Sequence, residues 1–558
     1  MTDGGGDRFS PLHTCLRQHA LRTPSKVAIV WYGRRITYRE LDDLSERFAE
    51  RLTALSVGPG DVVLLFMSNC PQFLIAHLGA QKAGAAVSPC NPMAKAYEFG
   101  HQARELCATV IVAEDRLLSV VAEAASPQHR PAVFSVNAGS MLPAVIDIDV
   151  PTELSLPGDP ALSRLAWVRD FDAELRDSAT SVQFCANVDP QALALIAYTS
   201  GTTGLPKGAM VSHKGVVHRT AATAETFGLT AADVMLSDTP LHHISGLVTG
   251  LSLPIYTGAT LVLLHSFDPA AVLQAIECCR VTWWYTMAPS LPWVMSADDA
   301  SHYAIESLRT VVATSFGLTL TEALGARWQA FAPGCTVYEA GYGMSETHTC
   351  DTLMPRDAIR WGTNGRPVRG VEVRIVDPVE GRLLPSGQPG EILLRSEVPF
   401  LGYWRRPEAT SEVFADGWLR TGDIGMLDAE GYLTFIGRRK EMIKVWSYSV
   451  YPEEVEAILA THPDVQQAAV VGCADPNRGE ALRAYVVLRR GATAIGGSHV
   501  DTARAQANLL DWCTRHMAHY KVPRQVEFRR RLPATGSGKL LRRLLGPDAT
   551  ALLAPIQI

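Results

Sequence analysis

Short apolar runs that alternate with helix-patterned segments constrain the fold of this chain more than any other feature of its sequence. The runs at 61–67 (DVVLLFM), 108–113 (ATVIVA) and 259–264 (ATLVLL) are almost wholly apolar, as is typical of strands buried on both faces of a sheet. Segments 37–55 and 71–85 carry apolar residues at helical spacing. This alternation of strand and helix predicts an α/β fold built on parallel sheets.

Other parts of the chain have different patterns. Residues 126–190 are irregular and rich in Pro, Ser and Asp, and we interpret them as a surface excursion rather than a separate domain. The apolar stretch 247–264 is interrupted by Pro254, Gly and Thr, so we expect a buried strand–turn–strand there and no transmembrane segment. Between 371 and 395, short strand-like segments separated by Gly, Pro and Asp predict an antiparallel β unit.

From residue 440 onward the chain has the pattern of a compact α+β unit. Its helix-like segments are 452–462 and 502–517, and its strand-like segments are 467–473 and 482–488. This part carries 16 Lys and Arg against 11 Asp and Glu, a net charge of +5, so the rest of the chain carries −11 of the total −6. A basic unit beside an acidic body can attract a polyanionic ligand, although ordinary surface variation explains the difference equally well.

Composition excludes several classes of protein. At 558 residues, with 47% hydrophobic and 19% charged residues, the chain fits three to five folded units and not a disordered protein. Its mild acidity argues against a nucleic-acid partner. The 11 cysteines include no CxxC pair, which predicts reduced thiols and a cytoplasmic location rather than a zinc ribbon or a disulfide scaffold. The start, MTDGGGDRFSPLH, lacks the features of a signal peptide, and we expect residues 1–8 to be flexible.

The motif most indicative of chemistry is 198–208 (YTSGTTGLPKG), which directly follows an apolar run at 192–197. Its glycines let backbone N–H groups approach a phosphate, its hydroxyls donate hydrogen bonds, and Lys207 supplies a positive charge. The spacing does not match a Walker A loop, which would need Gly at Pro206. A flexible linker is the alternative, but a linker rarely has this order directly after a strand.

Three further motifs are weaker when taken singly. Residues 342–346 (YGMSE) fit an aromatic stacking surface with a metal or nucleotide contact, and equally fit core packing with a turn. In 420–438, Asp423 is expected in a Gly-flanked turn, where a carboxylate can accept both hydroxyls of a ribose or can be purely structural. Residues 535–539 (TGSGK) present one lysine on a Gly-rich loop, or form only a β-turn.

In this order the four motifs are highly specific, and the chain resembles the adenylate-forming (AMP-binding) superfamily of acyl-CoA synthetases, peptide-synthetase adenylation domains and luciferases. The resemblance extends from about residue 9 to 545 and is closest in pattern to the acyl-CoA synthetases. Additional matching segments are PLHHISG at 240–246, LGYWRRPEAT at 401–410, DGWLRTGD at 416–423, GRRKEMIK at 437–444, YPEEVE at 451–456 and YKVPRQVEF at 520–528.

The resemblance implies a specific domain organisation. A large N-terminal AMP-binding domain of two α/β sheets would span residues 9–439 and include a β subdomain at about 365–439. A small, mobile α+β C-terminal domain would span 440–558. Lys440 would be the hinge between the two domains, and Lys444 would approach the active site after rotation.

The resemblance also implies a two-step reaction. A carboxylate attacks the α-phosphate of Mg-ATP to give an acyl-adenylate and pyrophosphate, and the thiol of CoA then displaces AMP. Lys539 would be catalytic by bridging the carboxylate and the phosphate, and His243 would lie near the acyl carboxylate. Glu346 would also be a catalytic residue, and together with Thr202 it would hold Mg²⁺.

The remaining implied contacts are to the nucleotide. Tyr342 would stack on the adenine, Asp423 would bind the ribose hydroxyls, and Arg438 would contact the ribose or phosphate region. The other residues of the implied nucleotide site are Thr199, Ser200, Gly201, Thr202, Thr203, Gly204 and Lys207 around the β- and γ-phosphates, together with Gly343 and Ser345 beside the adenine.

Two departures from the family pattern bear on substrate and acceptor. Trp446 and Ser447 stand where the family usually has a small residue and Gly beside the thiol tunnel. At 315–320 (SFGLTL) the family often has a Gly-Ala-Pro-Leu-like loop that lines the acyl pocket. The acyl-pocket wall is therefore unusual, and the acid is not transferable from the family.

These features predict an AMP-forming acid–thiol ligase that acts on a fatty or aryl acid and CoA. The segment 240–246 lacks the Phe-Asp that peptide-synthetase domains use for an amino acid. The first alternative is a stand-alone adenylating enzyme that loads a carrier-protein phosphopantetheine or another non-CoA acceptor. The second is a luciferase-type oxygenase or a catalytically inactive nucleotide binder, which the intact Lys539 and Glu346 disfavour. The sequence identifies neither the acid nor the oligomeric state.

Overall fold

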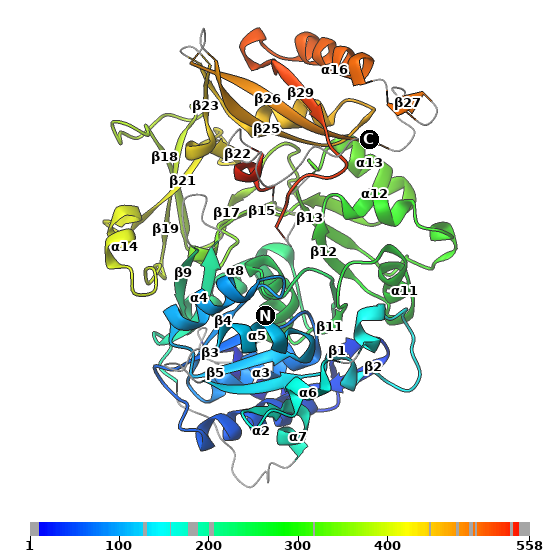
Figure 1. Cartoon of the computed structure of the whole chain (residues 1–558), viewed down its shortest axis with the longest axis vertical. Helices are drawn as coiled ribbons and strands as arrows, with labels where there is room; N and C mark the ends of the chain where they lie inside the picture. The colour runs from blue at the N-terminus through cyan, green and yellow to red at the C-terminus, as the bar shows by residue number, and fades with distance from the viewer. Residues whose placement is uncertain are drawn as a thin grey trace.

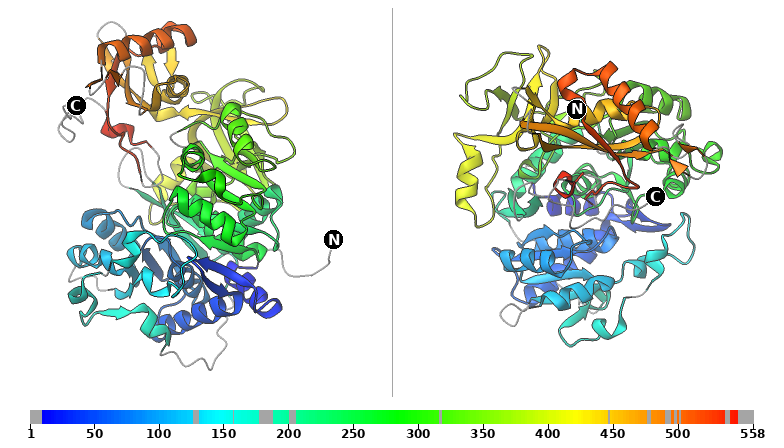
Figure 2. Two further views of the ribbon diagram at one scale, coloured as in Figure 1. Left: turned by 90° about the vertical axis from the view of Figure 1, so that its right-hand side faces the viewer. Right: turned by 45° about the horizontal axis from the view of Figure 1, so that its top comes forward.

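The computed structural model gives the fold of most of the chain (Figure 1). It describes residues 10–125, 131–156, 158–176, 188–199, 206–315, 318–445, 448–475, 479–489, 495–496, 499–500, 502–535 and 540–545. Two large sheets lie one above the other, a β unit flanks the second of them, and a C-terminal unit lies at the far end of the molecule (Figures 1 and 2). The predicted fold class, α/β with a β subdomain and a small α+β C-terminal unit, is confirmed.

The first sheet has the strand order β7-β6-β5-β3-β4-β8-β9 and is parallel except for the antiparallel β8–β9 pair. Every residue of β3 and β5 is buried, as their apolar runs predicted. The strands are β3 (Val62–Phe66), β4 (Ala86–Pro89), β5 (Val110–Glu114), β6 (Ala132–Val136), β7 (Val168–Asp170), β8 (Leu193–Thr199) and β9 (Lys207–Ser212). The accompanying helices are α1 (Leu12–Arg22), α2 (Tyr38–Ala54), α3 (Pro71–Lys82), α4 (Ala96–Leu106), α5 (Leu118–Ala124), α6 (Pro160–Ser163) and α7 (Phe171–Arg176).

The second sheet has the order β14-β13-β12-β10-β11-β1-β2, and only its edge pair β1–β2 is antiparallel among the described strands. Its strands are β1 (Val27–Trp31), β2 (Arg34–Thr37), β10 (Val234–Ser237), β11 (Thr260–Leu263), β12 (Trp283–Met287), β13 (Thr310–Thr314) and β14 (Thr336–Glu339). The surrounding helices are α8 (His213–Phe227), α9 (Ile244–Leu247), α10 (Leu253–Thr257), α11 (Pro269–Cys279), α12 (Ser290–Met295) and α13 (Glu322–Phe331).

Strand alternation divides the second sheet into two differently packed faces. Trp284 packs with Trp328 of α13 at 6.0 Å between ring centroids, in the large core cluster that also joins the two sheets through α3. Its neighbour Trp283 points to the opposite face and packs with Phe227 of α8 and with Tyr338 in a second cluster. Period-two alternation therefore gives two adjacent tryptophans different surroundings.

The β unit and the C-terminal unit have separate cores. The β unit consists of β18 (Val371–Val376), β19 (Gly390–Ser396), α14 (Pro407–Val413), β20 (Phe414–Ala415), β21 (Trp418–Leu427) and β22 (Leu433–Arg438), and its antiparallel pairing was predicted. The C-terminal unit consists of β23 (Ile443–Val445), β24 (Tyr448–Val450), α15 (Pro452–Ala460), β25 (Val465–Asp475), β26 (Gly479–Leu488), β27 (Ile495–Gly496), β28 (His499–Val500), α16 (Thr502–His516), β29 (Gln525–Phe528) and the 3-10 turn η9 (Arg542–Leu544). Its described core residues all lie at or beyond Ile443.

Two predicted segments have a different structure. Within 126–190, β6 and β7 extend the first sheet, so this region is not only a surface excursion; Pro131 and the polar residues after β6 hide a five-residue strand. The stretch 247–264 forms α9, a π-helical turn at Val248–Ser252, α10 and then β11, not strand–turn–strand. A continuous apolar run has no periodicity to distinguish helix from strand, and Pro254 is tolerated because it lies in the first turn of α10.

No helix in the described part of the chain is long and apolar enough to cross a membrane.

The interior around α3 holds several buried histidines. The rings of His13 in α1 and His213 at the start of α8 meet edge to face at 5.7 Å. Burial lowers the pKa of His13 to about 3, assisted by the neighbouring His213 and Lys82. Burial also lowers the pKa values of His77 and His348 to about 3 and that of His213 to about 4. These side chains are therefore neutral in the folded protein above about pH 4.

We predict that His13→Asn reduces the loss of stability on acidification. Unfolded His13 takes up a proton below its ordinary pKa of about 6.5, whereas folded His13 does not until about pH 3. The free energy of unfolding therefore falls as the pH decreases between these values, by about 2 kcal/mol from pH 7 to pH 5 for this group. Urea unfolding of wild type and variant at both pH values measures the difference. His302→Asn, at an exposed histidine, is the control, and an unchanged pH dependence in His13→Asn would contradict the assignment.

Candidate active site

Predicted site residues from distant parts of the sequence follow the carboxyl ends of strands in the second sheet. His243 comes after β10, Ser315 directly follows β13, and Tyr342 follows β14 within the short strand β15 (Gly341–Tyr342). Because these strands are parallel, the three residues lie along one edge of the sheet. That edge is where ligands bind in open α/β sheets.

A buried carboxylate links two of the motifs. Tyr342 donates its phenol proton to Asp423 Oδ2 at 2.8 Å, and Arg438 Nε lies 3.3 Å from Asp423 Oδ1. Asp423 and Arg438 are opposite each other on β21 and β22, so Asp423 lies within a strand and not in the predicted turn, although Gly422 beside it has φ +70°. Burial, and then the negative charge of Asp423, raises the pKa of Tyr342. The structure therefore brings Tyr342, Asp423 and Arg438 into one polar group.

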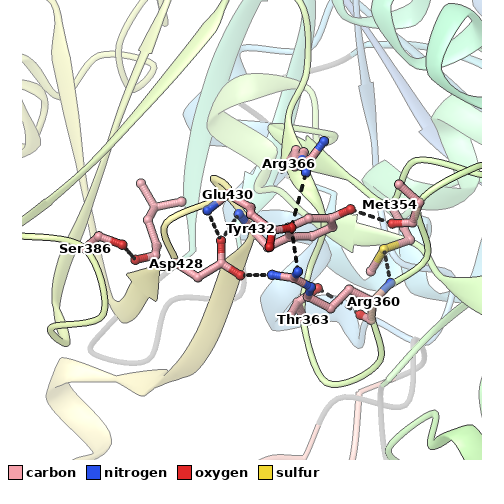
Figure 3. A network of polar contacts seen from close by, with 10 residues as sticks. Met354, Arg360, Thr363, Arg366, Ser386, Asp428, Glu430 and Tyr432 are labelled. Carbon is pink, nitrogen blue, oxygen red and sulfur yellow. Dashed lines mark hydrogen bonds and ion pairs between the residues drawn. The ribbon is translucent and has the colours of Figure 1, made fainter.

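At the turn of the β21–β22 hairpin, a charged network fixes the hairpin (Figure 3). The guanidiniums of Arg360 and Arg366 lie 4.4 and 4.3 Å from the ring centroid of Tyr432. Arg360 also forms ion pairs with Asp428 and Glu430, which stand in the hairpin turn. Cation–π contacts and paired charges of this kind hold the loop before β17 (Arg366–Pro367) against β22.

The same loop positions the aromatic surface near Asp423. The Asn364 side-chain oxygen accepts a hydrogen bond from the Phe435 backbone N–H at 2.8 Å, and the Asn364 backbone N–H donates to Leu433 O at 2.6 Å. The Phe435 ring stacks on Tyr342, with a centroid distance of 6.0 Å and an interplanar angle of 24°. Sequence reasoning missed Phe435 and Asn364, although both lie near motifs that it identified.

A second polar group joins the end of the phosphate motif to Glu346. Tyr403 donates its phenol proton to Glu346 Oε1 at 2.7 Å, and Lys207 Nζ lies 5.0 Å from the centroid of the Tyr403 ring. Backbone hydrogen bonds from Met210 to Gly402 O and from Trp404 to Gly208 O pin this segment to β9. Burial raises the pKa of Glu346, and the Tyr403 hydroxyl opposes that shift. Tyr403 was not predicted as a site residue, although its segment was matched to the family.

The backbone around YGMSE is tightly folded. A Cβ on Gly343 would lie 2.3 Å from the Cys350 nitrogen, so no side chain fits there. Ser345 opens a 3-10 turn (Ser345–Thr347), after which His348, Thr349 and Cys350 all have left-handed φ between 51° and 58°. Three successive non-glycine residues in this region carry backbone strain of the kind that concentrates at functional sites.

The described residues contain no group of three or more His, Cys, Asp or Glu side chains that could hold a metal ion alone. Glu346 is a single buried carboxylate with one oxygen held by Tyr403. Mg²⁺ is commonly bound by one or two carboxylates together with substrate phosphates. The donor set therefore fits a Mg²⁺ ion that arrives with a nucleotide.

On the other side of the edge, polar side chains gather around His243 and Ser315. His243 Nδ1 lies 2.8 Å from Ser245 Oγ and caps α9. The Tyr285 hydroxyl is hydrogen bonded to Ser245, and burial raises its pKa. Glu339 accepts hydrogen bonds from the N–H (3.2 Å) and the hydroxyl of Ser315, while burial raises its pKa to about 7. Glu339 and Tyr285 were not predicted, since nothing in their local sequence distinguishes them from core residues.

Several predicted residues have other positions or are not described. Thr199 ends β8, and its hydroxyl donates to Lys207 O at 3.4 Å. Lys440 lies in the 3-10 turn η7 (Arg439–Glu441), and Lys444 lies in β23, where its N–H donates to Glu480. The predictions at Ser200, Gly201, Thr202, Thr203, Gly204, Trp446, Ser447 and Lys539 fall outside the described residues.

The chain is similar in sequence and in fold to known CoA ligases. The long-chain-fatty-acid–CoA ligase of Bacillus subtilis (strain 168) is 29% identical over 97% of this chain and 94% of the relative. The 4-coumarate–CoA ligase 3 of Oryza sativa subsp. japonica is 30% identical over 94% and 90%. The crystal structure of the anthranilate CoA ligase AuaEII with anthranoyl-AMP superimposes with a TM-score of 0.82, at 26% identity over 98% of both chains.

Family matches cover both ends of the chain. Residues 454–539 match the AMP-binding enzyme C-terminal domain. Residues 16–404, well over half of the chain, match the AMP-binding enzyme family. The chain belongs to the AMP-binding enzyme family and is an enzyme.

Proposed function

We propose that this enzyme is an AMP-forming acid–thiol ligase. It uses ATP to convert a carboxylic acid into an acyl-adenylate and then transfers the acyl group to the thiol of CoA with release of AMP. The observation that carries the proposal is the buried Tyr342–Asp423–Arg438 group at the edge of the second sheet. A carboxylate held by one phenol and one guanidinium suits the two hydroxyls of a ribose, and the aromatic pair with Phe435 suits adenine.

The proposed first step joins two anions, and cations must offset their repulsion. Lys207 in β9 and Arg438 in β22 come from different sheets, and Lys539 would bridge the carboxylate and the α-phosphate, as the family resemblance implies. Fixed positive charge in a water-poor site stabilises the charge that develops in such a transition state. Glu346, with Thr202, would hold Mg²⁺ on the phosphates, where the ion neutralises their charge.

We infer that the second step depends on two domains that meet near Lys440 and rotate relative to each other. The proposed domains are 9–439, with a β subdomain at about 365–439, and 440–558, and the separate cores of the two parts support this division. Rotation about Lys440 would replace Lys539 by Lys444 and admit the thiol. All ten described cysteines are free, which suits the reducing cytoplasm where we propose that the enzyme works.

The packing between α8 and the second sheet favours a compact acid. Phe227 lies 5.8 Å from Trp283 and 6.4 Å from Tyr338 between ring centroids, and all three are almost wholly buried. Tyr285, two residues from Trp283, faces Ser245 beside His243. An acid bound at His243 and directed along this face would run into these packed aromatic side chains, which leave no room for a long chain. We therefore propose that the substrate is an aryl or short-chain acid rather than a long-chain fatty acid.

The direct test is acid-dependent pyrophosphate release across a panel of aryl, short-chain, long-chain and amino acids, followed by addition of CoA or a carrier protein. The proposal requires release with at least one aryl or short-chain acid and an acyl-CoA product without carrier protein. If the acyl product formed only on the carrier protein, the acceptor would be the carrier protein and not CoA.

We predict that Asp423→Asn raises the KM for ATP about 10- to 100-fold, because it removes a charge-assisted contact to the ribose. ATP–pyrophosphate exchange measures it. Glu372→Gln, which breaks an exposed ion pair with Arg395 in the same β unit, is the control. An unchanged KM in Asp423→Asn would contradict the ribose assignment.

We predict that Lys539→Ala lowers adenylation by roughly 100- to 1,000-fold, the usual cost of losing one charge-stabilising group. Thioester formation from chemically synthesised acyl-adenylate should persist, because the bridge between acid and phosphate is no longer needed. Pyrophosphate release at the wild-type rate would refute the role of Lys539.

We predict that Trp283→Leu raises the ratio of kcat/KM for octanoate to that for benzoate at least 10-fold, because removing the indole frees space beside Phe227. Trp284→Leu makes the same change one residue away on the opposite face of the sheet and should leave the ratio unchanged. An equal change in both variants would show that the effect is general loosening of the core.

A further inference from the structure

The residues on either side of Lys440 form ion pairs with different parts of the chain. On one side, Arg439 Nη1 lies 3.5 Å from Glu391 Oε2 in β19, and the same buried carboxylate pairs with Arg420. On the other side, Glu441 pairs with Arg542 of η9 in the C-terminal unit. The residue before Lys440 is therefore fixed to the β unit, and the residue after it is fixed to the C-terminal unit.

Arg542 is more strongly held than an ordinary surface arginine. Its Nε and Nη2 donate to the two carboxylate oxygens of Glu456 at 2.9 and 2.6 Å, and Nη1 lies 2.8 Å from Glu453 Oε1. Its side chain is only 14% exposed. Bidentate pairing of a largely buried guanidinium gives both energy and a fixed orientation.

The arginine cluster, defined here as Arg542 with Glu441, Glu453 and Glu456, also reaches the body of the enzyme. A Cβ on Gly437 in β22 would lie 2.7 Å from Glu453 Oε2, so β22 packs directly against this carboxylate. Burial raises the pKa of Glu453 to about 7; the carboxylates of Glu456 and Glu441 add to this rise, and the guanidinium of Arg542 opposes it. Gly437 and Glu453 stand on opposite sides of Lys440 in the sequence, so rotation there would separate them while Arg542 keeps its hold on Glu441.

Arg542 stands three residues after Lys539. Ala534 and Leu540 form an antiparallel bridge, and the Leu541 N–H donates to Pro533 O at 2.9 Å. These contacts bring together the two chain segments that flank 535–539. Arg542 thus anchors the base of the segment that carries the proposed adenylation lysine.

We propose that Arg542 is a positioning residue that ties the pivot at Lys440 to η9, which follows Lys539 in the sequence. Its pairing with Glu441 makes η9 move together with the first residue beyond the pivot, and its pairing with Glu456 orients η9 on α15. The proposal rests on the proposed adenylation function and on Lys440 as the pivot. A purely structural arginine would instead affect both half-reactions equally through stability.

The test begins with acid-dependent ATP–pyrophosphate exchange by the wild-type full chain. Arg542→Gln should lower the exchange kcat at least 10-fold with the KM for ATP within twofold, because the predicted ATP contacts in the described structure lie outside the arginine cluster. Thioester formation from supplied acyl-adenylate should change less than threefold. Arg542→Lys, which keeps the charge without the bidentate fork, should recover part of the exchange rate.

The coupling itself is measured by a double-mutant cycle. Glu441→Gln removes only the contact at the pivot and leaves Glu453 and Glu456 in place, so it should slow exchange without unfolding the C-terminal unit. The Arg542→Gln/Glu441→Gln double variant should be no slower than Arg542→Gln alone. Arg529→Gln, which breaks an ion pair with Glu527 within the C-terminal unit, is the matched control and should have wild-type rates.

Trypsin cleavage after Arg439 and Lys440 gives a readout that needs no activity. Arg542→Gln and Glu441→Gln should both be cleaved there faster than Arg529→Gln, because the pivot has lost its anchor. Equal cleavage, additive effects in the cycle, or equal loss of both half-reactions would overturn the coupling. If the wild type shows no acid-dependent pyrophosphate exchange with any acid of the panel, the proposed function fails. The cleavage result alone then decides whether Arg542 holds the pivot.

Discussion

The proposed site depends on the buried carboxylate of Asp423 and its two partners. A buried ionised carboxylate is costly unless partners satisfy it, and here Tyr342 and Arg438 satisfy it from two different elements. The same contacts bind Tyr342, which follows β14, to the β21–β22 hairpin and so link the second sheet to the β unit. The Arg360–Tyr432–Arg366 stack stabilises the hairpin near its turn, and the proposed ribose site depends on that arrangement.

Charge pairing also suits the proposed use of one chain for two half-reactions. Arg438, Arg439 and Glu441 are close together in the sequence, yet their partners are Asp423, Glu391 and Arg542 in three different places. The chain is therefore held by ion pairs on both sides of Lys440, where we propose that the backbone torsion changes. Rigid anchors around a short pivot are the usual basis of hinge motion.

The sequence predicted the fold class, and the structure brings three of its candidate site residues, Tyr342, Asp423 and Arg438, together. Short apolar runs such as 61–67 identified buried strands because a run of that length fits a strand better than a helix, whereas the ligand contacts of the Gly-rich motifs stay predictions. The structure of 247–264 was predicted wrongly because a uniformly apolar run has no periodicity. The strand β6 was missed because the residues that flank it are polar or Pro. Asp423 was taken for a turn residue because Gly422 precedes it. Tyr403, Glu339 and Arg542 act only through partners more than 20 residues away, which no local pattern reveals.

The central claim is that a carboxylate oxygen attacks the α-phosphorus of ATP at this site. The most direct measurement uses an acid labelled with ¹⁸O in its carboxylate, Mg-ATP and CoA, and analyses the nucleotide product by mass spectrometry. Attack by the carboxylate, followed by thiol displacement at the carbonyl, leaves one labelled oxygen in AMP. AMP without label, or ADP as the product, would contradict the account.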